Sequence, residues 1–207
     1  MKTLLFQGDS ITDASRRRDL DIAMGCGYAT MTAGRLAVDF PNAFRFLNRG
    51  VSGEHVQHVR ARIQEDIIQL KPDIMTLMIG VNNVWQSVLD NAEFSAGEVA
   101  SQVEELILEV QRALPDIQIV LLQPFVLSGT ATKSRIELFR ERVGALSEAY
   151  LILAEGLKIP YVTFQAELDA MAEVISFEDL APDGVHPTCC GHEIISRKLY
   201  EVLKAMI

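Results

Sequence analysis

The stretch Leu4-Leu5-Phe6-Gln7-Gly8-Asp9-Ser10 decides the fold of this chain, because an apolar run passes directly into a glycine, an acid and a serine. Consecutive apolar residues without alternation are typical of a strand that is buried on both faces. The glycine marks a sharp turn at the carboxyl end of that strand. The sequence therefore predicts a buried first strand that ends by presenting Ser10 at the edge of a sheet.

Four more apolar runs indicate short strands, at Phe44–Leu47, Asp73–Ile79, Gln118–Leu122 and Pro160–Val162. Between them, apolar residues recur every three or four positions and predict helices over 56–70, 99–110, 136–153 and 194–206. Ser95 with Glu98 and Ser134 with Glu137 are predicted capping boxes, and Gly156 stands where the third of these helices should end.

This alternation predicts an α/β protein with a parallel sheet and helices on both faces, in one domain over residues 1–207. Ligands of such sheets bind at the carboxyl ends of the strands. That rule selects the loops at 8–13, 48–55 and 80–85, which are rich in glycine, serine and asparagine.

Composition excludes several classes of protein. The chain has 207 residues, is 49% hydrophobic and carries a formal net charge of −9, which disfavours nonspecific nucleic-acid binding and an anionic membrane partner. No apolar run is long enough to span a bilayer. The three cysteines, Cys26, Cys189 and Cys190, make a poor disulfide framework. A reducing, cytoplasmic location is therefore expected.

Three residues have the chemistry of a nucleophilic site. Ser10 is a weak nucleophile until a base takes its proton, and His186 is the candidate base. Asp183 lies three residues before His186, where a carboxylate can orient the imidazole. Developing negative charge on a substrate oxygen needs hydrogen-bond donors, and the backbone N–H groups of Ser10 and Gly53 and the amide of Asn82 are candidates. Each residue alone has a simpler interpretation as a turn or helix-cap residue, but their joint occurrence at strand ends favours catalysis.

The chain resembles the SGNH (GDSL-type) hydrolase family in four blocks, namely Gly8-Asp9-Ser10-Ile11-Thr12-Asp13, Asn48-Arg49-Gly50-Val51-Ser52-Gly53, Gly80-Val81-Asn82-Asn83 and Asp183-Gly184-Val185-His186-Pro187. This resemblance implies a flavodoxin-like three-layer α/β/α sandwich with a five-stranded parallel sheet in the order 2-1-3-4-5. It also implies Ser10 as nucleophile, His186 as base, Asp183 as its orienting acid, and an oxyanion hole formed by Ser10, Gly53 and Asn82.

Further positions look like the intracellular acetylxylan-esterase-type members of that family: Asp13, Arg16, Gly27-Tyr28, Val84-Trp85 and Gly191-His192. Such members deacetylate xylo-oligosaccharides and often form oligomers, so a homo-oligomer is expected. The chain departs from the family at Asn83, where an aspartate is usual. It also lacks the Cys-Gly pair that acetylxylan-esterase-type members have after the aspartate that matches Asp13, so the resemblance is weaker evidence for the substrate than for the family.

Tyr28 and Trp85 are predicted to line the substrate pocket because aromatic faces stack on sugar rings, with core packing as the alternative. Asp9, beside Ser10, is assigned to the same pocket. A zinc site built from His186, Cys189, Cys190 and His192 is disfavoured because adjacent cysteines rarely bind one ion. The two cysteines are expected instead to pack at the start of the last helix.

The sequence thus predicts a serine carboxylester hydrolase that removes short acyl groups, acetyl first, from a carbohydrate or other small ester. No metal or organic cofactor is required, and neither a nucleic acid nor a membrane is an expected partner. A lysophospholipase, a thioesterase or an aryl esterase is the enzymatic alternative. A flavodoxin-like module that binds a small ligand without turnover is the alternative outside enzymes.

Overall fold

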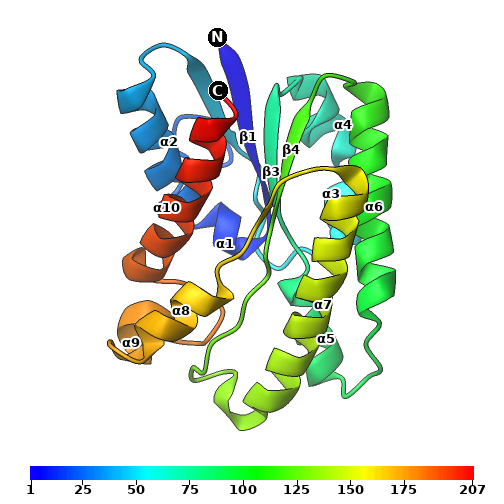
Figure 1. The fold of residues 1–207 in the computed structure, drawn as a ribbon, viewed down its shortest axis with the longest axis vertical. Helices are drawn as coiled ribbons and strands as arrows, with labels where there is room; N and C mark the ends of the chain where they lie inside the picture. Colours follow the sequence, from blue (N-terminus) through cyan, green and yellow to red (C-terminus); the bar gives the residue numbers. More distant parts are fainter.

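The computed structural model describes all 207 residues, and its centre is one parallel sheet with helices on both sides (Figure 1). The five strands are β1 (Lys2–Gly8), β2 (Phe44–Asn48), β3 (Ile74–Met78), β4 (Gln118–Leu122) and β5 (Tyr161–Val162). Their order in the sheet is β2-β1-β3-β4-β5, and every neighbouring pair is parallel. The predicted α/β fold and strand order are therefore confirmed.

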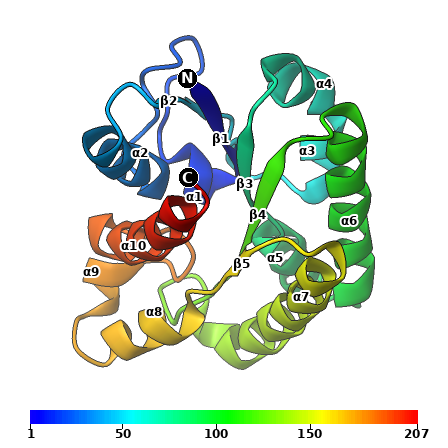
Figure 2. The same cartoon turned by 45° about the horizontal axis from the view of Figure 1, so that its top comes forward.

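Helices form a layer on each face of this sheet (Figure 2). On one face α2 (Tyr28–Asp39) packs against α10 (Cys189–Ala205). On the other face α6 (Ala96–Ala113) packs against α7 (Ile136–Leu157). The shorter elements are α1 (Ser10–Asp13), α3 (Val56–Ala61), α4 (Ile63–Asp66), η1 (Ile68–Leu70), α5 (Val81–Leu89), η2 (Lys133–Arg135), α8 (Gln165–Ala172) and α9 (Phe177–Leu180).

Strand β1 is an interior strand of the sheet, between β2 and β3. Leu4, Leu5 and Phe6 are all fully buried, since helices cover both faces of the strand. This double burial explains why the run shows no alternation of polar and apolar residues. Ser10, which follows β1, therefore lies at the carboxyl edge of the sheet, between the ends of β2 and β3.

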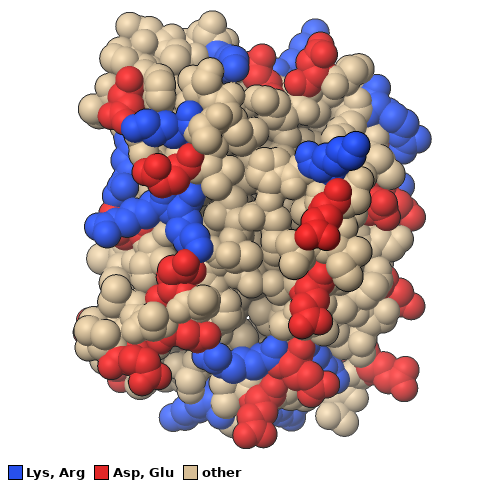
Figure 3. All heavy atoms as spheres, in the orientation of Figure 1, with Lys and Arg blue, Asp and Glu red and all other residues tan.

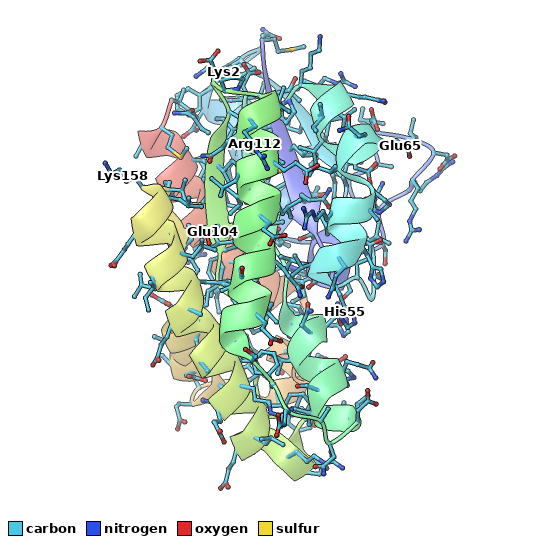
Figure 4. All side chains as sticks on the ribbon, turned by 90° about the vertical axis from the view of Figure 1, so that its right-hand side faces the viewer. Lys2, His55, Glu65, Glu104, Arg112 and Lys158 are labelled. Carbon is cyan, nitrogen blue, oxygen red and sulfur yellow. The ribbon has the colours of Figure 1, made fainter.

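Helix α6 follows the predicted pattern. The Ser95 hydroxyl accepts a hydrogen bond from the Glu98 N–H at 3.2 Å, which is one of the two hydrogen bonds of the predicted capping box. The buried side is formed by Val99, Ala100, Val103, Leu106, Ile107 and Val110. Glu104 and Arg112 point outward on the opposite side (Figure 4). The apolar stripe therefore covers the sheet, while the charged side faces solvent.

Two predicted helix ends are wrong. Ser134 caps no helix, because it lies inside η2, a short 3₁₀ turn that leads directly into α7. Gly156 is still helical, and Lys158 ends α7 in the left-handed region at φ 55°, with its N–H bonded to the Ala154 carbonyl. Leu153 and Ala154 are buried in the core, so packing carries the helix past the glycine.

The single helix predicted over 56–70 is also wrong, since the segment consists of α3, α4 and η1. The Arg62 N–H bonds to the Val59 carbonyl, three residues back, and this tighter turn separates α3 from α4. Helix α2 had no predicted counterpart, although it forms one of the two outer layers.

Charged side chains of both signs are interspersed on the face seen in Figure 3, and no broad basic patch gathers there. Among the helices, none combines the length and apolar character needed to cross a membrane.

Candidate active site

Ser10 is the first residue of α1 and directly follows the turn after β1. The Asp9 carboxylate caps this helix, with Oδ1 accepting the Ile11 N–H at 3.1 Å. The Asp9 carbonyl accepts the N–H groups of Thr12 and Asp13. This short capped helix fixes the backbone of Ser10 at the carboxyl edge of the sheet.

A chain of hydrogen bonds joins the serine, the histidine and the aspartate. Ser10 Oγ lies 2.8 Å from His186 Nε2, across 176 positions of sequence. His186 Nδ1 lies 2.6 Å from Asp183 Oδ2. The three side chains thus meet within proton-transfer distance, as the sequence predicted.

Asp183 is held in its ionised form by the loop that carries it. Partial burial alone would raise its pKa. Hydrogen bonds to the carboxylate from the His186 N–H at 2.8 Å, the His186 side chain and the Val185 N–H at 2.9 Å outweigh burial, and the pKa is lowered below its ordinary value. An ionised Asp183 keeps a proton on His186 Nδ1, which leaves Nε2 free to accept the Ser10 proton.

The loop that carries Asp183 and His186 has no secondary structure and is held by the segment after β4. The N–H groups of Leu127, Thr130 and Ala131 donate to the carbonyls of Gly184, Pro182 and Asp183 at 2.8, 2.9 and 3.3 Å. The segment after β4 was not among the three loops selected from the sequence. The strand-end rule could have selected it, because it follows the carboxyl end of β4.

Thr132 braces this segment from within. Its buried hydroxyl donates to the Leu127 carbonyl at 2.6 Å and accepts the Gly129 N–H at 2.9 Å. The Thr132 hydroxyl therefore stabilises the turn over residues 127–132. The N–H groups of the same turn bind the loop that carries Asp183.

The three predicted oxyanion donors border one cavity, which also contains Ser10 Oγ and His186. The backbone N–H groups of Ser10 and Gly53 have no acceptor within the protein. Asn82 donates one amide hydrogen to the Glu54 carbonyl at 2.9 Å, so its second amide hydrogen stays available. Gly53 has a φ of 80°, which turns its backbone in a way that other residues rarely adopt.

The loop that carries Gly53 is anchored by buried polar contacts. The Asn48 amide donates to the carbonyls of Thr12 and Met24 at 2.6 and 2.8 Å, and its oxygen accepts the Gly50 N–H at 2.9 Å. Asp13 Oδ2 accepts the Ser52 N–H at 3.2 Å. The loops after β1 and β2 are thus tied together, so Ser10 and Gly53 are positioned as one unit.

Of the predicted pocket residues, only Trp85 lines the cavity, where it packs on Phe139 at 5.1 Å between ring centroids. The prediction is wrong for Asp9 and Tyr28, which are 1% and 0% exposed. Asp9 turns inward to cap α1, and the Tyr28 hydroxyl bonds to Thr12 Oγ1 at 2.8 Å beneath the site.

Burial makes the Asp9 carboxyl a weaker acid than usual. Desolvation raises its pKa from 3.8 to about 7, although the Ile11 N–H and the nearby His186 act in the opposite direction. Its Oδ2 atom is buried and has no hydrogen-bond partner. A carboxyl whose pKa is raised to about 7 is therefore adjacent in sequence to Ser10.

The cavity has a volume of about 760 Å³ and includes residues that the sequence did not single out as pocket residues, among them Cys26 and His192. Cys189 does begin α10, but it is exposed and lines the cavity, so its expected packing role is wrong. No three His, Cys, Asp or Glu side chains are arranged to hold a metal ion.

The chain is similar to known proteins over most of its length. Residues 6–194 match the GDSL-like Lipase/Acylhydrolase family. A curated acetylxylan esterase from Geobacillus stearothermophilus is 31% identical over 203 residues, which cover 94% of this chain and 90% of that protein. A putative GDSL-like lipase from Parabacteroides merdae superimposes with a TM-score of 0.91 at 28% identity, covering 98% of this chain and 95% of that one.

The crystal structure of Axe2, an acetylxylan esterase from Geobacillus stearothermophilus, gives a TM-score of 0.83 at 31% identity and covers 97% of this chain and 93% of Axe2. Axe2 has also been solved as catalytic mutants of a serine, an aspartate and a histidine. The fold and the site thus define a hydrolase built on a parallel sheet with helices on both faces. The chain belongs to the GDSL-like lipase/acylhydrolase family, and it is a carboxylic ester hydrolase.

Replacing Thr132 by valine should destabilise the protein by roughly 2–4 kcal/mol, since it leaves a buried N–H and a buried carbonyl without a partner. Thr130→Val is the matched control, because the Thr130 hydroxyl is exposed and water can replace its bond to Pro182. Urea unfolding of both variants measures the difference. Equal stability of the two variants would contradict a bracing role for Thr132.

Asp9→Asn should change how stability depends on pH. Folded Asp9 keeps its proton to higher pH than unfolded Asp9, so the contribution of Asp9 to the free energy of unfolding falls as pH rises from about 4 to about 7. The asparagine still caps α1 but does not ionise. A shift from 3.8 to about 7 corresponds to a relative gain for the variant on the order of 4 kcal/mol across that interval.

Urea unfolding at pH 4, 5.5 and 7.5 tests this expectation. Asp116→Asn, which changes an exposed acid, is the control and should follow the natural protein at each pH. A constant difference between Asp9→Asn and the natural protein at all three pH values would show that Asp9 does not titrate in this range.

Proposed function

We propose that this protein is a serine esterase that removes acetyl groups from an uncharged carbohydrate, with Ser10 as nucleophile, His186 as general base and Asp183 as orienting acid. The observation that carries the proposal is the continuous contact from Ser10 Oγ to His186 Nε2 at 2.8 Å and from His186 Nδ1 to Asp183 Oδ2 at 2.6 Å. The catalytic mutants of Axe2 at the same three residue types support it.

In the first half of the reaction, Ser10 Oγ attacks the ester carbonyl carbon and its proton passes to His186 Nε2. The carbonyl oxygen gains negative charge, which the N–H groups of Ser10 and Gly53 and the free amide hydrogen of Asn82 stabilise. These donors are fixed before substrate binds, so little reorganisation is needed. His186 then protonates the leaving alcohol and an acetyl-serine forms.

In the second half, His186 takes a proton from water, which attacks the acetyl-serine carbonyl. The same donors stabilise the second oxyanion. His186 returns the proton to Ser10 Oγ as acetate leaves. Asp183 stays ionised throughout and stabilises the histidine cation that forms in each half.

The lining of the cavity supports a neutral substrate. Asp183 is the only Asp, Glu, Lys or Arg among the residues that line it. Uncharged polar residues, such as Ser15, Ser52 and Thr188, border the rest together with Trp85. Hydroxyl groups and an aromatic face are groups that bind sugars, and the relatives with printed activities are acetylxylan esterases. Self-association, a cytoplasmic location and a single domain over residues 1–207 stay predictions from the sequence.

Ser10→Ala should lower kcat for p-nitrophenyl acetate by roughly 10⁴-fold or more, since the nucleophile is lost while the fold is kept. Ser101→Ala, on the exposed side of α6, is the matched control. A fluorophosphonate should label the natural protein and the control but leave Ser10→Ala unlabelled. Undiminished turnover by Ser10→Ala would refute the proposal.

An acyl-length series should show a preference for acetate over butyrate and octanoate esters of the same alcohol. The measurement is kcat/KM for p-nitrophenyl acetate, butyrate and octanoate, followed by acetate release from acetylated xylo-oligosaccharides. A preference for octanoate would favour the lysophospholipase or thioesterase alternative, for which a cavity of about 760 Å³ has room.

A further inference from the structure

His192 is a second histidine at the active-site cavity, and the mechanism above does not use it. It lies in the first turn of α10 and is 6% exposed. Its Nδ1 atom accepts the Tyr28 N–H at 3.2 Å, and its ring stacks on the Tyr28 ring at 6.3 Å between centroids. These contacts fix both the position and the orientation of the imidazole.

The contact with Tyr28 also fixes where the proton lies. A backbone N–H can donate to Nδ1 only if Nδ1 carries a lone pair, so the single proton of the neutral ring is on Nε2. Burial, together with the nearby charge of His186, lowers the pKa of His192 to about 4. His192 is therefore a neutral hydrogen-bond donor at neutral pH.

This donor has no acceptor within the protein, although His192 lines the cavity. The backbone of Gly27 passes close to the edge of the ring that carries the donor. A methyl group at Gly27 would lie 2.8 Å from His192 Cε1 and 3.1 Å from Nε2, and also 2.6 Å from the Ala14 side chain. Glycine at this position thus leaves the Nε2 edge free of a neighbouring side chain. Because His192 borders the cavity and its Nε2 atom is not buried, a ligand or water can accept this hydrogen bond.

The remaining cavity wall indicates what the acceptor is. A neutral donor beside hydroxyl-bearing residues, in a cavity without Lys or Arg, suits an uncharged oxygen rather than a carboxylate or phosphate. Apart from the esterified oxygen itself, a sugar has many such oxygens, whereas a hydrocarbon chain or a simple phenol has none. The donor would therefore distinguish esters by their alcohol part.

We propose that His192 determines substrate specificity by donating its Nε2 hydrogen to a hydroxyl or ring oxygen in the alcohol part of a carbohydrate ester. This inference rests on the proposed function, because it assumes that Ser10 and His186 perform the hydrolysis. It assigns His192 to binding the sugar and leaves proton transfer to His186.

Two variants separate binding from structure. In His192→Asn the shorter amide can still accept the Tyr28 N–H but cannot reach the Nε2 position. In His192→Gln the amide nitrogen can take the Nε2 position, while the acceptor for Tyr28 is lost. Each variant is assayed on acetylated xylo-oligosaccharide and on phenyl acetate, whose alcohol part has no hydroxyl or ring oxygen. The ratio of the two kcat/KM values does not depend on how much of the protein is folded, so a partly unfolded variant is still informative.

The expected result is a ratio of sugar ester to phenyl acetate that falls about three- to tenfold in His192→Asn, the worth of one neutral hydrogen bond, through a higher KM for the sugar ester. In His192→Gln the ratio should stay within about twofold of the natural protein. An unchanged ratio in His192→Asn would overturn the proposal. A ratio that falls in His192→Gln but not in His192→Asn would also overturn the proposal. That result would show that the contact with the Tyr28 N–H, and not the Nε2 donor, determines the ratio.

The Ser10→Ala measurement keeps this test separate from the proposed function. If Ser10→Ala retains activity, the proposed function is wrong and the assignment of His192 fails with it. If Ser10→Ala is inactive and the ratio is unchanged in His192→Asn, only the assignment of His192 is wrong.

Discussion

The hydrogen bonds between the segment after β4 and the Pro182–Gly184 backbone are the constraint on which the site depends. Ser10 is fixed by β1 and a capped helix, but its partners Asp183 and His186 lie on a loop with no secondary structure of its own. Backbone donors at Leu127, Thr130 and Ala131 fix that loop at the edge of the sheet. The contact between Ser10 and His186 at 2.8 Å is therefore a consequence of packing around β4 as much as of the two residues themselves.

The ionisable groups around His186 differ in pKa because they differ in burial and in hydrogen bonding. Asp183 is partly exposed and receives several hydrogen bonds, so it stays ionised. Asp9 is buried with a pKa near 7, and His192 is buried with a pKa near 4. His192 is therefore neutral at neutral pH, and its contact with the Tyr28 N–H makes Nε2 the atom that carries its proton. Two histidines six positions apart thus differ in chemistry because their surroundings differ.

Much of the fold follows from local patterns. Five apolar runs predict the strands, and the buried run Leu4–Phe6 predicts a parallel sheet because it needs cover on both faces. Local sequence signals do not predict helix ends that depend on packing. Ser134 has a hydroxyl that could cap a helix, but it lies within the 3₁₀ helix η2. Helix α7 continues beyond Gly156 because its last turns pack in the core. Tyr28 was expected in the pocket because aromatic rings stack on sugars, and Asp9 because it lies beside Ser10, yet both are buried. Which way a side chain turns depends on neighbours that arrive from other parts of the chain.

The sequence by itself determined the strand and helix alternation, the loops at the carboxyl ends of β1, β2 and β3, and the candidates Ser10, Gly53, Asn82, Asp183 and His186. These features are local, since each depends on residue type and spacing within a few positions. Only the tertiary structure decided that Asp9 is buried, that the segment from Leu127 to Thr132 holds Asp183 and His186, and that His192 lines the cavity. The physical reason is that burial, pKa and hydrogen-bond partners are set by contacts between segments far apart in the chain, such as Tyr28 with His192 across 164 positions.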